Sequence, residues 1–321
     1  MSREKVKWEA MLPHEFVKIR DRFPVCYMAY GLAEPHGAYN ALGLDWLKAY
    51  ALVEAAATDY GGIVAPPCAW HIQEVPEFHD DGKGNGWLCD VGVRQPLSSS
   101  IPADLFYRMV LYQIRAIDAR GFHAAVLVTG HYGGVEVILR RICEYYLLRS
   151  GSPMRIYAIA DWECIDEDLP YRGDHAGICE TSQLMALCPG LTDLRRRTCD
   201  EELGERFAGG VNFASGSHPT EEIGKQIIES QIRNLGRKAR NLLSEYVSQS
   251  GWKAPDLNET EDIWRTFEPL ARRYWTVTYK EYKERTVQKF PEWDTLNVTA
   301  SNSIGNGAKQ DAVADAGQSR K

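Results

Sequence analysis

Three side chains of the kinds that bind divalent metal ions lie close together near the start of the chain: Glu34, His36 and Asp45. Two carboxylates and an imidazole form a ligand set that suits a hard or borderline divalent cation. The apolar run at residues 24–29 precedes them, and such runs are typical of buried strands. The pattern predicts a metal site in a loop at the end of a strand.

A second turn with a metal-binding side chain follows another apolar run. Residues 124–129 are mostly apolar, and the glycine-rich turn 130–134 after them carries His131 and Tyr132. Parallel strands present their carboxyl ends at one edge of a sheet, which is where ligands bind in such folds. Two strand ends that each carry metal-binding side chains therefore predict a metal-dependent hydrolase.

Composition and charge narrow the function classes. The 321 residues are 44% hydrophobic and 25% charged, which is ordinary for a globular protein. A net charge of -7 argues against a nucleic-acid partner. No apolar run approaches the ~18 residues of a membrane span, and the N-terminus lacks the apolar segment of a secretory signal. We therefore expect a cytoplasmic protein without a membrane partner, in which the eight cysteines are reduced.

The order of the predicted elements indicates the fold class. Apolar strands alternate with amphipathic helices, which favours a mainly parallel sheet covered on both faces. We predict a three-layer α/β/α fold, with Asp45 in a loop before a helix that ends at Gly61. The strands are expected at residues 24–29, 63–65, 124–129 and 155–160. The other helices are expected at 102–121, after the Gly130 turn with residues 137–146, from about 177 and at 219–247.

The composition changes after residue 248, which predicts three segments. Residues 1–248 are expected to form the hydrolase domain, and residues 249–298 a helical C-terminal extension with its helix at 261–287. The extension is rich in aromatic residues, and we consider that it packs on a neighbouring subunit. Residues 299–321 have almost no large apolar side chain and are expected to be disordered.

Three motifs in order make the chain resemble the creatininase (creatinine amidohydrolase) superfamily, as a divergent member rather than creatininase itself. They are Glu34-Pro35-His36-Gly37 with Asp45, the turn Gly130-His131, and His175 followed by Glu180-Thr181-Ser182. A weaker match follows at residues 216–219, and the resemblance spans residues 15–245. It implies a creatininase-like fold and an amidohydrolase that opens a small cyclic or linear amide with a metal-bridged hydroxide.

The resemblance also implies a ligand set for two divalent metal ions per subunit, with zinc favoured and manganese or iron as alternatives. Glu34 and His131 would hold one ion, His36 the other, and Asp45 would bridge them. Creatininase has a metal-binding glutamate two residues after the turn histidine, where this chain has Gly133. We expect Glu180 to supply the missing carboxylate, with Glu136 as the alternative. The departure makes creatinine an unexpected substrate.

Other residues receive roles in catalysis and substrate binding. The matching family histidine makes His175 the candidate general acid and base, while Tyr132, Trp162, His71 and Trp70 are candidates for the substrate pocket. Each has an ordinary structural alternative, since polar residues cap helices and aromatic residues at strand ends commonly pack. A cysteine nucleophile such as Cys68 or Cys179 would need a paired base, which the spacing does not indicate.

Two further hypotheses stay open at this point. The same two-metal site is compatible with a lyase or isomerase that abstracts a proton beside a carbonyl. Alternatively, the protein is a non-catalytic, metal-stabilised oligomer. Relatives assemble as closed homo-oligomers, so a homo-oligomer is expected here, with a hexamer favoured, and a small-molecule amide is the expected partner.

Overall fold

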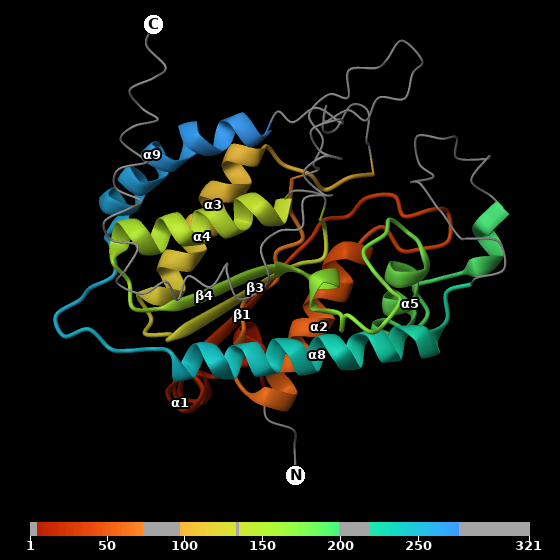
Figure 1. Cartoon of the computed structure of the whole chain (residues 1–321), viewed down its shortest axis with the longest axis horizontal. Helices are drawn as coiled ribbons and strands as arrows, with labels where there is room; N and C mark the ends of the chain where they lie inside the picture. Colours follow the sequence, from red (N-terminus) through yellow and green to blue (C-terminus); the bar gives the residue numbers. More distant parts are fainter. Residues whose placement is uncertain (1–4, 73–96, 133–134, 199–217, 276–321) are drawn as a thin grey trace, which may run out of the picture.

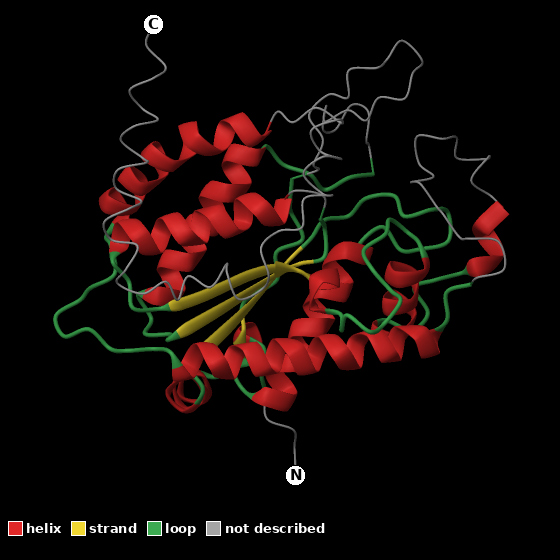
Figure 2. Ribbon diagram, in the orientation of Figure 1, coloured by secondary structure: helices red, strands yellow, loops and turns green. Residues whose placement is uncertain are grey.

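A parallel sheet forms the centre of the molecule. The computed structural model describes residues 5–72, 97–132, 135–198 and 218–275. Within this part, four strands lie in the order β2-β1-β3-β4, and each neighbouring pair is parallel (Figure 2). The strands are β1 (Val25–Tyr30), β2 (Ile63–Val64), β3 (Ala124–Thr129) and β4 (Arg155–Ala160). β1 pairs with β3 along its whole length, so the carboxyl ends of these two strands lie side by side.

Helices cover both faces of the sheet (Figure 1). The α3, α4 and α9 helices lie on one face, and α2 and α8 lie on the other. The α-helices are α1 (Pro13–Arg22), α2 (Leu44–Tyr60), α3 (Ala103–Asp118), α4 (Val135–Ser150), α5 (Ile178–Leu187), α8 (Glu221–Ser244) and α9 (Leu257–Trp275). Short 3-10 helices are η1 (Trp8–Ala10), η2 (Asp161–Cys164) and η3 (Leu194–Thr198). The predicted three-layer α/β/α fold is confirmed.

Alternation along the strands explains why the sheet is apolar throughout. Successive side chains of a strand point to opposite faces. Met28 of β1 packs in the cluster beneath α3, α4 and α9, whereas the neighbouring Tyr27 packs with α2 and α8. Because helices cover both faces, both sets of side chains must be apolar, and the strands are visible in the sequence as continuous apolar runs.

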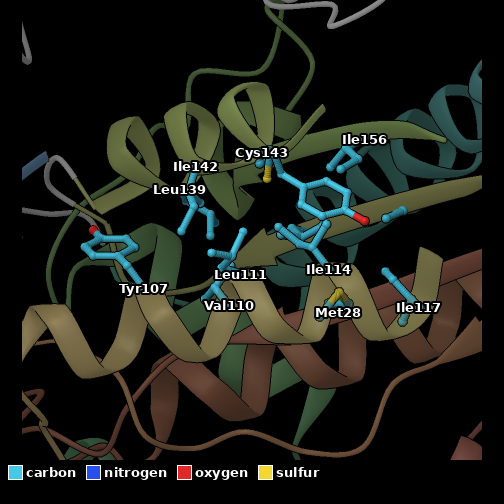
Figure 3. Packing of buried hydrophobic residues seen from close by; sticks show 14 of the residues in the cluster. Met28, Tyr107, Val110, Leu111, Ile114, Ile117, Leu139, Ile142, Cys143 and Ile156 are labelled. Atoms are coloured by element: carbon cyan, nitrogen blue, oxygen red, sulfur yellow. The ribbon is translucent and has the colours of Figure 1, made fainter. Parts of the chain in front are cut away.

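The layer formed by α3 and α4 is a close-packed apolar core. Val110, Leu111 and Ile114 of α3 are fully buried and face Ile142 of α4, while Met28 approaches from β1 (Figure 3). The α3 positions recur three and four residues apart, which is the spacing of one helix face. Burying each such side chain contributes roughly 1.5–3 kcal/mol, so this layer is a main source of stability.

The α9 helix belongs to the same core. It begins at Leu257, four residues before the expected start at Glu261, and its buried residues Ile263, Trp264 and Phe267 join the α3 and α4 cluster. Arg108 and Tyr112 of α3 donate hydrogen bonds to Glu261 on its surface. The buried face of α9 thus packs within the chain, and packing of the extension on a neighbouring subunit stays a prediction. Residues 276–298 of the predicted extension and the 299–321 tail lie outside the described residues, and the boundary at residue 248 stays a prediction.

Most predicted elements occur close to their expected limits. The strands at 124–129 and 155–160 have the predicted bounds, and the helix expected at 219–247 is α8. The start of α2 differs from the prediction at a candidate ligand. Asp45 lies in the first turn of α2 rather than in the preceding loop. An acidic residue there is favoured by the helix dipole. In the described ranges, none of the helices is long and apolar enough to cross a membrane.

Candidate metal centre

The predicted ligands meet at the carboxyl ends of β1 and β3. Glu34 and His36 lie in the loop after β1, and His131 directly follows β3. Asp45 comes from the start of α2, and Glu180 comes from the first turn of α5. All five are buried, with at most 8% of any one residue exposed. Such burial of ionisable groups is costly unless they are paired or bind a cation.

Two glycines allow the start of α2 to approach the strand ends. A Cβ atom on Gly31, after β1, would lie 2.5 Å from the backbone nitrogen of Trp46. A Cβ atom on Gly130, after β3, would collide with the backbone carbonyl oxygen of Asp45. Both positions therefore require the absence of a side chain. The close approach carries the Asp45 carboxylate between the two strand-end loops.

The ligand atoms form three overlapping groups. Within each group all atoms lie within 4.8 Å of one another, and the groups are Glu34-Asp45-His131, His36-Asp45-Glu180 and Glu34-His36-His175. Asp45 belongs to two of them and directs its oxygens to different histidines. Its Oδ1 lies 3.1 Å from His36 Nε2, and its Oδ2 lies 3.0 Å from His131 Nδ1. This is the geometry of a carboxylate shared between two sites.

The hydrogen bonding of His36 indicates that a cation belongs beside it. Nδ1 lies 3.0 Å from the backbone carbonyl oxygen of Glu34, so in the neutral ring Nδ1 carries the proton and donates to this oxygen. Nε2 then presents a lone pair to carboxylate oxygens, at 3.1 Å from Asp45 and 3.6 Å from Glu180, without an accepted hydrogen bond. A lone pair facing anions is repulsive unless a cation lies between them. The donor set therefore fits a divalent metal ion.

The pKa shifts of His36 and Asp45 also show that the cluster favours positive charge. Burial opposes the charged form of His36, but the Asp45, Glu180 and Glu34 carboxylates outweigh it and raise the His36 pKa from 6.5 to about 9. Despite burial, the two histidines hold the pKa of Asp45 well below its usual range. Protons on the imidazoles thus satisfy the carboxylates in the ion-free protein, and metal ions would replace those protons.

Glu180 rather than Glu136 joins the cluster. Its Oε2 lies 3.6 Å from His36 Nε2 and accepts a hydrogen bond from the backbone N–H of Ala176 at 2.8 Å. Glu136 is buried in α4 and belongs to none of the three groups. Its charge acts instead on Glu163, whose pKa is raised mainly by burial and further by Glu136. The geometry therefore favours the first of the two alternatives that the sequence left open.

Lys48 is a buried residue of this region that sequence reasoning missed. It lies one helical turn after Asp45 in α2, and its ammonium contacts Glu180 Oε1 at 2.6 Å and Asp161 Oδ2 at 3.4 Å. Burial opposes its charge, but the Asp161 and Glu180 carboxylates outweigh burial and raise the pKa of Lys48. The available signal was the i, i+3 spacing from Asp45, which puts both side chains on the same helix face.

His175 lies at the solvent side of the cluster. Its ring centroid is 4.5 Å from that of His36, and its Nδ1 is 4.0 Å from Glu34 Oε1. The side chain is 35% exposed, compared with 10% or less for the side chains of the five predicted ligands. Burial and the charge of His36 lower the pKa of His175, so its ring is neutral near pH 7. The histidine is therefore available to exchange a proton with a bound molecule.

The four candidate substrate residues lie in different surroundings. Tyr132 donates a hydrogen bond to the Asp174 carbonyl oxygen at 2.6 Å and packs edge-on against Trp162. Both rings contact the loop that carries His175, since a Cβ atom on Gly173 would meet each of them. His71 is buried beside His131, with ring centroids 5.4 Å apart, whereas Trp70 is 57% exposed. Substrate contact by these four residues stays a prediction.

His71, Cys68 and Cys179 have pKa values that do not suit them to acid–base or nucleophilic catalysis. Burial and neighbouring His131 lower the pKa of His71 to about 3, so its ring is neutral, and its Nδ1 lies 2.9 Å from the Ile72 carbonyl oxygen. Burial raises the pKa of the Cys68 thiol and holds that of Cys179 well above its usual range. Both thiols are unpaired, which agrees with the expected reduced state. Neither has the lowered pKa of a cysteine nucleophile.

Comparison with known proteins assigns the class. The creatininase family model, described as creatinine amidohydrolase, matches residues 9–238. The chain therefore belongs to the creatininase family. Among curated proteins, the creatinine amidohydrolase of Pseudomonas putida is 23% identical over 190 residues, which cover 54% of this chain and 67% of that protein. Family membership supports assignment of the chain as an amidohydrolase, and the three ligand groups support metal binding.

Solved structures agree on the fold. A creatininase crystal structure superposes with a TM-score of 0.58 at 19% identity, over 77% of this chain and 100% of the other. A manganese creatininase gives the same score over 74% and 98% of the two chains. A putative creatinine amidohydrolase from Bacteroides fragilis gives 0.54 at 16% identity, over 78% and 100%. A zinc–zinc form of a creatininase variant is also similar, so both metals occur in proteins of this fold.

Proposed function

We propose that the protein is a binuclear metal-dependent amidohydrolase that cleaves a C–N bond in a small cyclic or linear amide. The observation that carries the proposal is the position of Asp45, whose two oxygens face His36 and His131 from a fully buried site. Two metal sites that share one carboxylate explain why so many ionisable groups are buried together. Zinc is the first candidate and manganese the second, since forms of related proteins contain each.

The ligands divide into two sets around Asp45. Glu34 and His131 would hold one ion, and His36 and Glu180 would hold the other. When bound, the ions supply Lewis acidity, which acidifies a water molecule and polarises the amide carbonyl. The Nδ1–H of His36 donates to the Glu34 carbonyl oxygen and fixes the ring, which leaves Nε2 as the atom that would bind an ion. The chain's own part is thus to hold the ligand atoms in place and exclude bulk water.

His175 is suited to the proton transfer that amide cleavage needs. The nitrogen leaving group must gain a proton, and a neutral imidazole can take one from the attacking water and deliver it to that nitrogen. The Nε2 atom of His175 lies 3.2 Å from the Pro35 carbonyl oxygen, which orients the ring. Its Nδ1 side faces the cluster near Glu34. His175 therefore acts as general base and then general acid in the proposed reaction.

A substrate panel in heavy-oxygen water tests this function. Purified protein loaded with zinc or manganese is incubated with lactams and linear formamides in H₂¹⁸O, and the products are identified by mass spectrometry. Hydrolysis puts one heavy oxygen into the carboxylate of the product, and Asp45→Asn should remove the activity. Products that form without ¹⁸O in a carboxylate would instead support the lyase or isomerase alternative. A metal-loaded protein without turnover on any amide would support the non-catalytic one.

A further inference from the structure

The Lys48 ammonium is held in a buried pocket of negative charge. Its side chain is 0% exposed, and it contacts Glu180 Oε1 at 2.6 Å and Asp161 Oδ2 at 3.4 Å. It also lies 4.8 Å from the centroid of the Tyr132 ring, whose face attracts a cation. A fully buried lysine is costly unless it is paired. Its presence therefore requires a function or a structural need specific to this region.

Asp161 is fixed from the opposite side. Its Oδ2 accepts a hydrogen bond from the side-chain amide of Gln183, which also donates to Gln231. Its Oδ1 accepts a hydrogen bond from the backbone N–H of Trp162 at 2.8 Å. Asp161 lies in η2 directly after β4, at the same edge of the sheet as the metal ligands. Asp161 is thus an anchored carboxylate against which Lys48 can be held in one position.

Glu180 is fixed at both of its oxygens. Lys48 contacts Oε1, while the backbone N–H of Ala176 donates to Oε2. Ala176 has a φ angle of 53°, a left-handed conformation that is uncommon for a residue with a Cβ atom. The hydroxyl groups of Tyr39 and Thr181 donate to its carbonyl oxygen and support this conformation. With these contacts, Oε2 remains on the side that faces His36.

We propose that Lys48 is a positioning residue for the second metal ion, which acts by holding the Glu180 carboxylate toward His36. This inference rests on the proposed binuclear site and goes beyond it, because Lys48 is not itself a metal ligand and would act through its contacts with Glu180 and Asp161. Without the ammonium, two buried carboxylates would face each other, and Glu180 would turn away from Asp161. The ion held by His36 and Glu180 would bind more weakly, while the ion held by Glu34 and His131 would not change.

Equilibrium titration of the ion-free protein with Co²⁺ tests the proposal without any substrate. Calorimetry gives the dissociation constants of the binding steps, and the visible spectrum of bound Co²⁺ reports its coordination. Glu180→Gln identifies the step that depends on Glu180. Lys48→Met should weaken the same step by about 10–100-fold, the range for residues that orient metal ligands, and leave the other step unchanged. Lys225→Met, at an exposed lysine of α8, is the matched control.

A double variant separates positioning from general structure. If Lys48 acts through Glu180, then Lys48→Met combined with Glu180→Gln should bind Co²⁺ no more weakly than Glu180→Gln alone. Lys48→Gln takes the place of Lys48→Met if the latter does not fold. Parent-like binding and an unchanged Co²⁺ spectrum in the Lys48 variant would overturn the proposal, as would additive losses in the double variant. Fewer than two bound Co²⁺ in the parent would instead overturn the proposed function together with this inference.

Discussion

The two helical layers of the molecule differ in where their buried charges lie. The core beneath α3, α4 and α9 is formed by apolar side chains such as Leu111 and Ile142, and the charged residues that these helices bury, Asp118, Glu136 and Arg140, belong to none of the metal-ligand groups. On the other side, the starts of α2 and α5 bury Asp45, Lys48 and Glu180 at the carboxyl edge of the sheet. The first layer gains free energy from each side chain separately. The second depends on every charge finding a partner.

The apolar layer mainly stabilises the fold, whereas the charged layer mainly serves the candidate metal centre. Removing apolar surface from water is favourable at roughly 25 cal/mol per Å² and needs no specific geometry. Desolvation of an ion costs several kcal/mol and is repaid only by well-placed opposite charge. Substitutions in the apolar layer should therefore reduce stability and leave metal binding intact. Substitutions in the charged layer should weaken metal binding.

The largest effect is expected for Asp45→Asn. The variant loses the carboxylate shared by both ligand groups, so both ions should be lost and amide hydrolysis should fall to background. Residues that merely orient ligands typically cost about 10–100-fold in metal affinity or activity, and loss of the shared ligand should exceed that range. Elemental analysis and far-UV circular dichroism measure metal content and folding. The control is Asp193→Asn at an exposed aspartate. An active Asp45→Asn protein with two ions would contradict the account.

A smaller loss is expected for His175→Asn, which tests whether the charged layer holds a proton-transfer group as well as ligands. Removal of a general acid and base typically costs about 10²–10⁴-fold in rate. We expect kcat to fall within that range while the protein retains both ions. His123→Asn provides the control, because His123 stacks on Tyr246 away from the cluster. If His175→Asn binds fewer ions, but the fraction of protein that keeps both ions has the parent's kcat, then His175 is a metal ligand instead.

In the apolar layer, Leu111→Ala should reduce stability without affecting the metals. Leu111 is fully buried in α3, and such truncations cost about 2–5 kcal/mol through lost burial and the cavity left behind. Urea unfolding of the ion-free protein measures the free energy of unfolding. Leu105→Ala on the exposed side of the same helix should change it little. A loss of metal affinity in Leu111→Ala would break the separation between the two layers.

The buried carboxyl group of Asp118 in α3 makes the free energy of unfolding depend on pH. Burial raises the pKa of Asp118 from 3.8 to about 6, although Tyr146 donates a hydrogen bond to it. Between pH 4 and 6 the folded protein therefore retains a proton that the unfolded chain has lost, so stability falls as pH rises through this window. Two pKa units at about 1.4 kcal/mol each set an upper limit of about 3 kcal/mol.

Asp118→Asn isolates this contribution, because an asparagine does not titrate. Urea unfolding of parent and variant at several pH values between 4 and 7 measures it. The parent should lose more stability than the variant as pH rises from 4 to 6, and the difference should then stay constant to pH 7. Parallel curves for the two proteins would show that the Asp118 carboxyl titrates alike in the folded and unfolded states.

The sequence was most informative where structure depends on local pattern. The strands at 124–129 and 155–160 were predictable because a strand buried on both faces must be an apolar run. The start of α2 was not predictable in this way. There the backbone of Asp45 lies in close contact with Gly130, which is distant in the sequence. Such a contact between distant residues leaves no local signal.

The candidate site divides in a similar way. Glu34, His36 and Asp45 stand out because metal-binding side chains are close in the sequence, whereas Glu180 could be named only from the resemblance to a family. Lys48 was missed because a single lysine in a helix normally indicates an exposed face. Its burial becomes visible only when α5 and η2 bring Glu180 and Asp161 to it. The contacts of Lys48 with Glu180 and Asp161 are thus the part of this site that could not be predicted from the sequence.

Metal content per subunit shows whether the protein holds a binuclear centre. Protein purified without chelators is analysed by elemental mass spectrometry, alongside Glu180→Ala prepared in the same way. We expect close to two divalent ions per subunit in the parent and close to one in the variant. One ion or none in the parent, or two in both proteins, would contradict a binuclear centre built on Asp45 and Glu180.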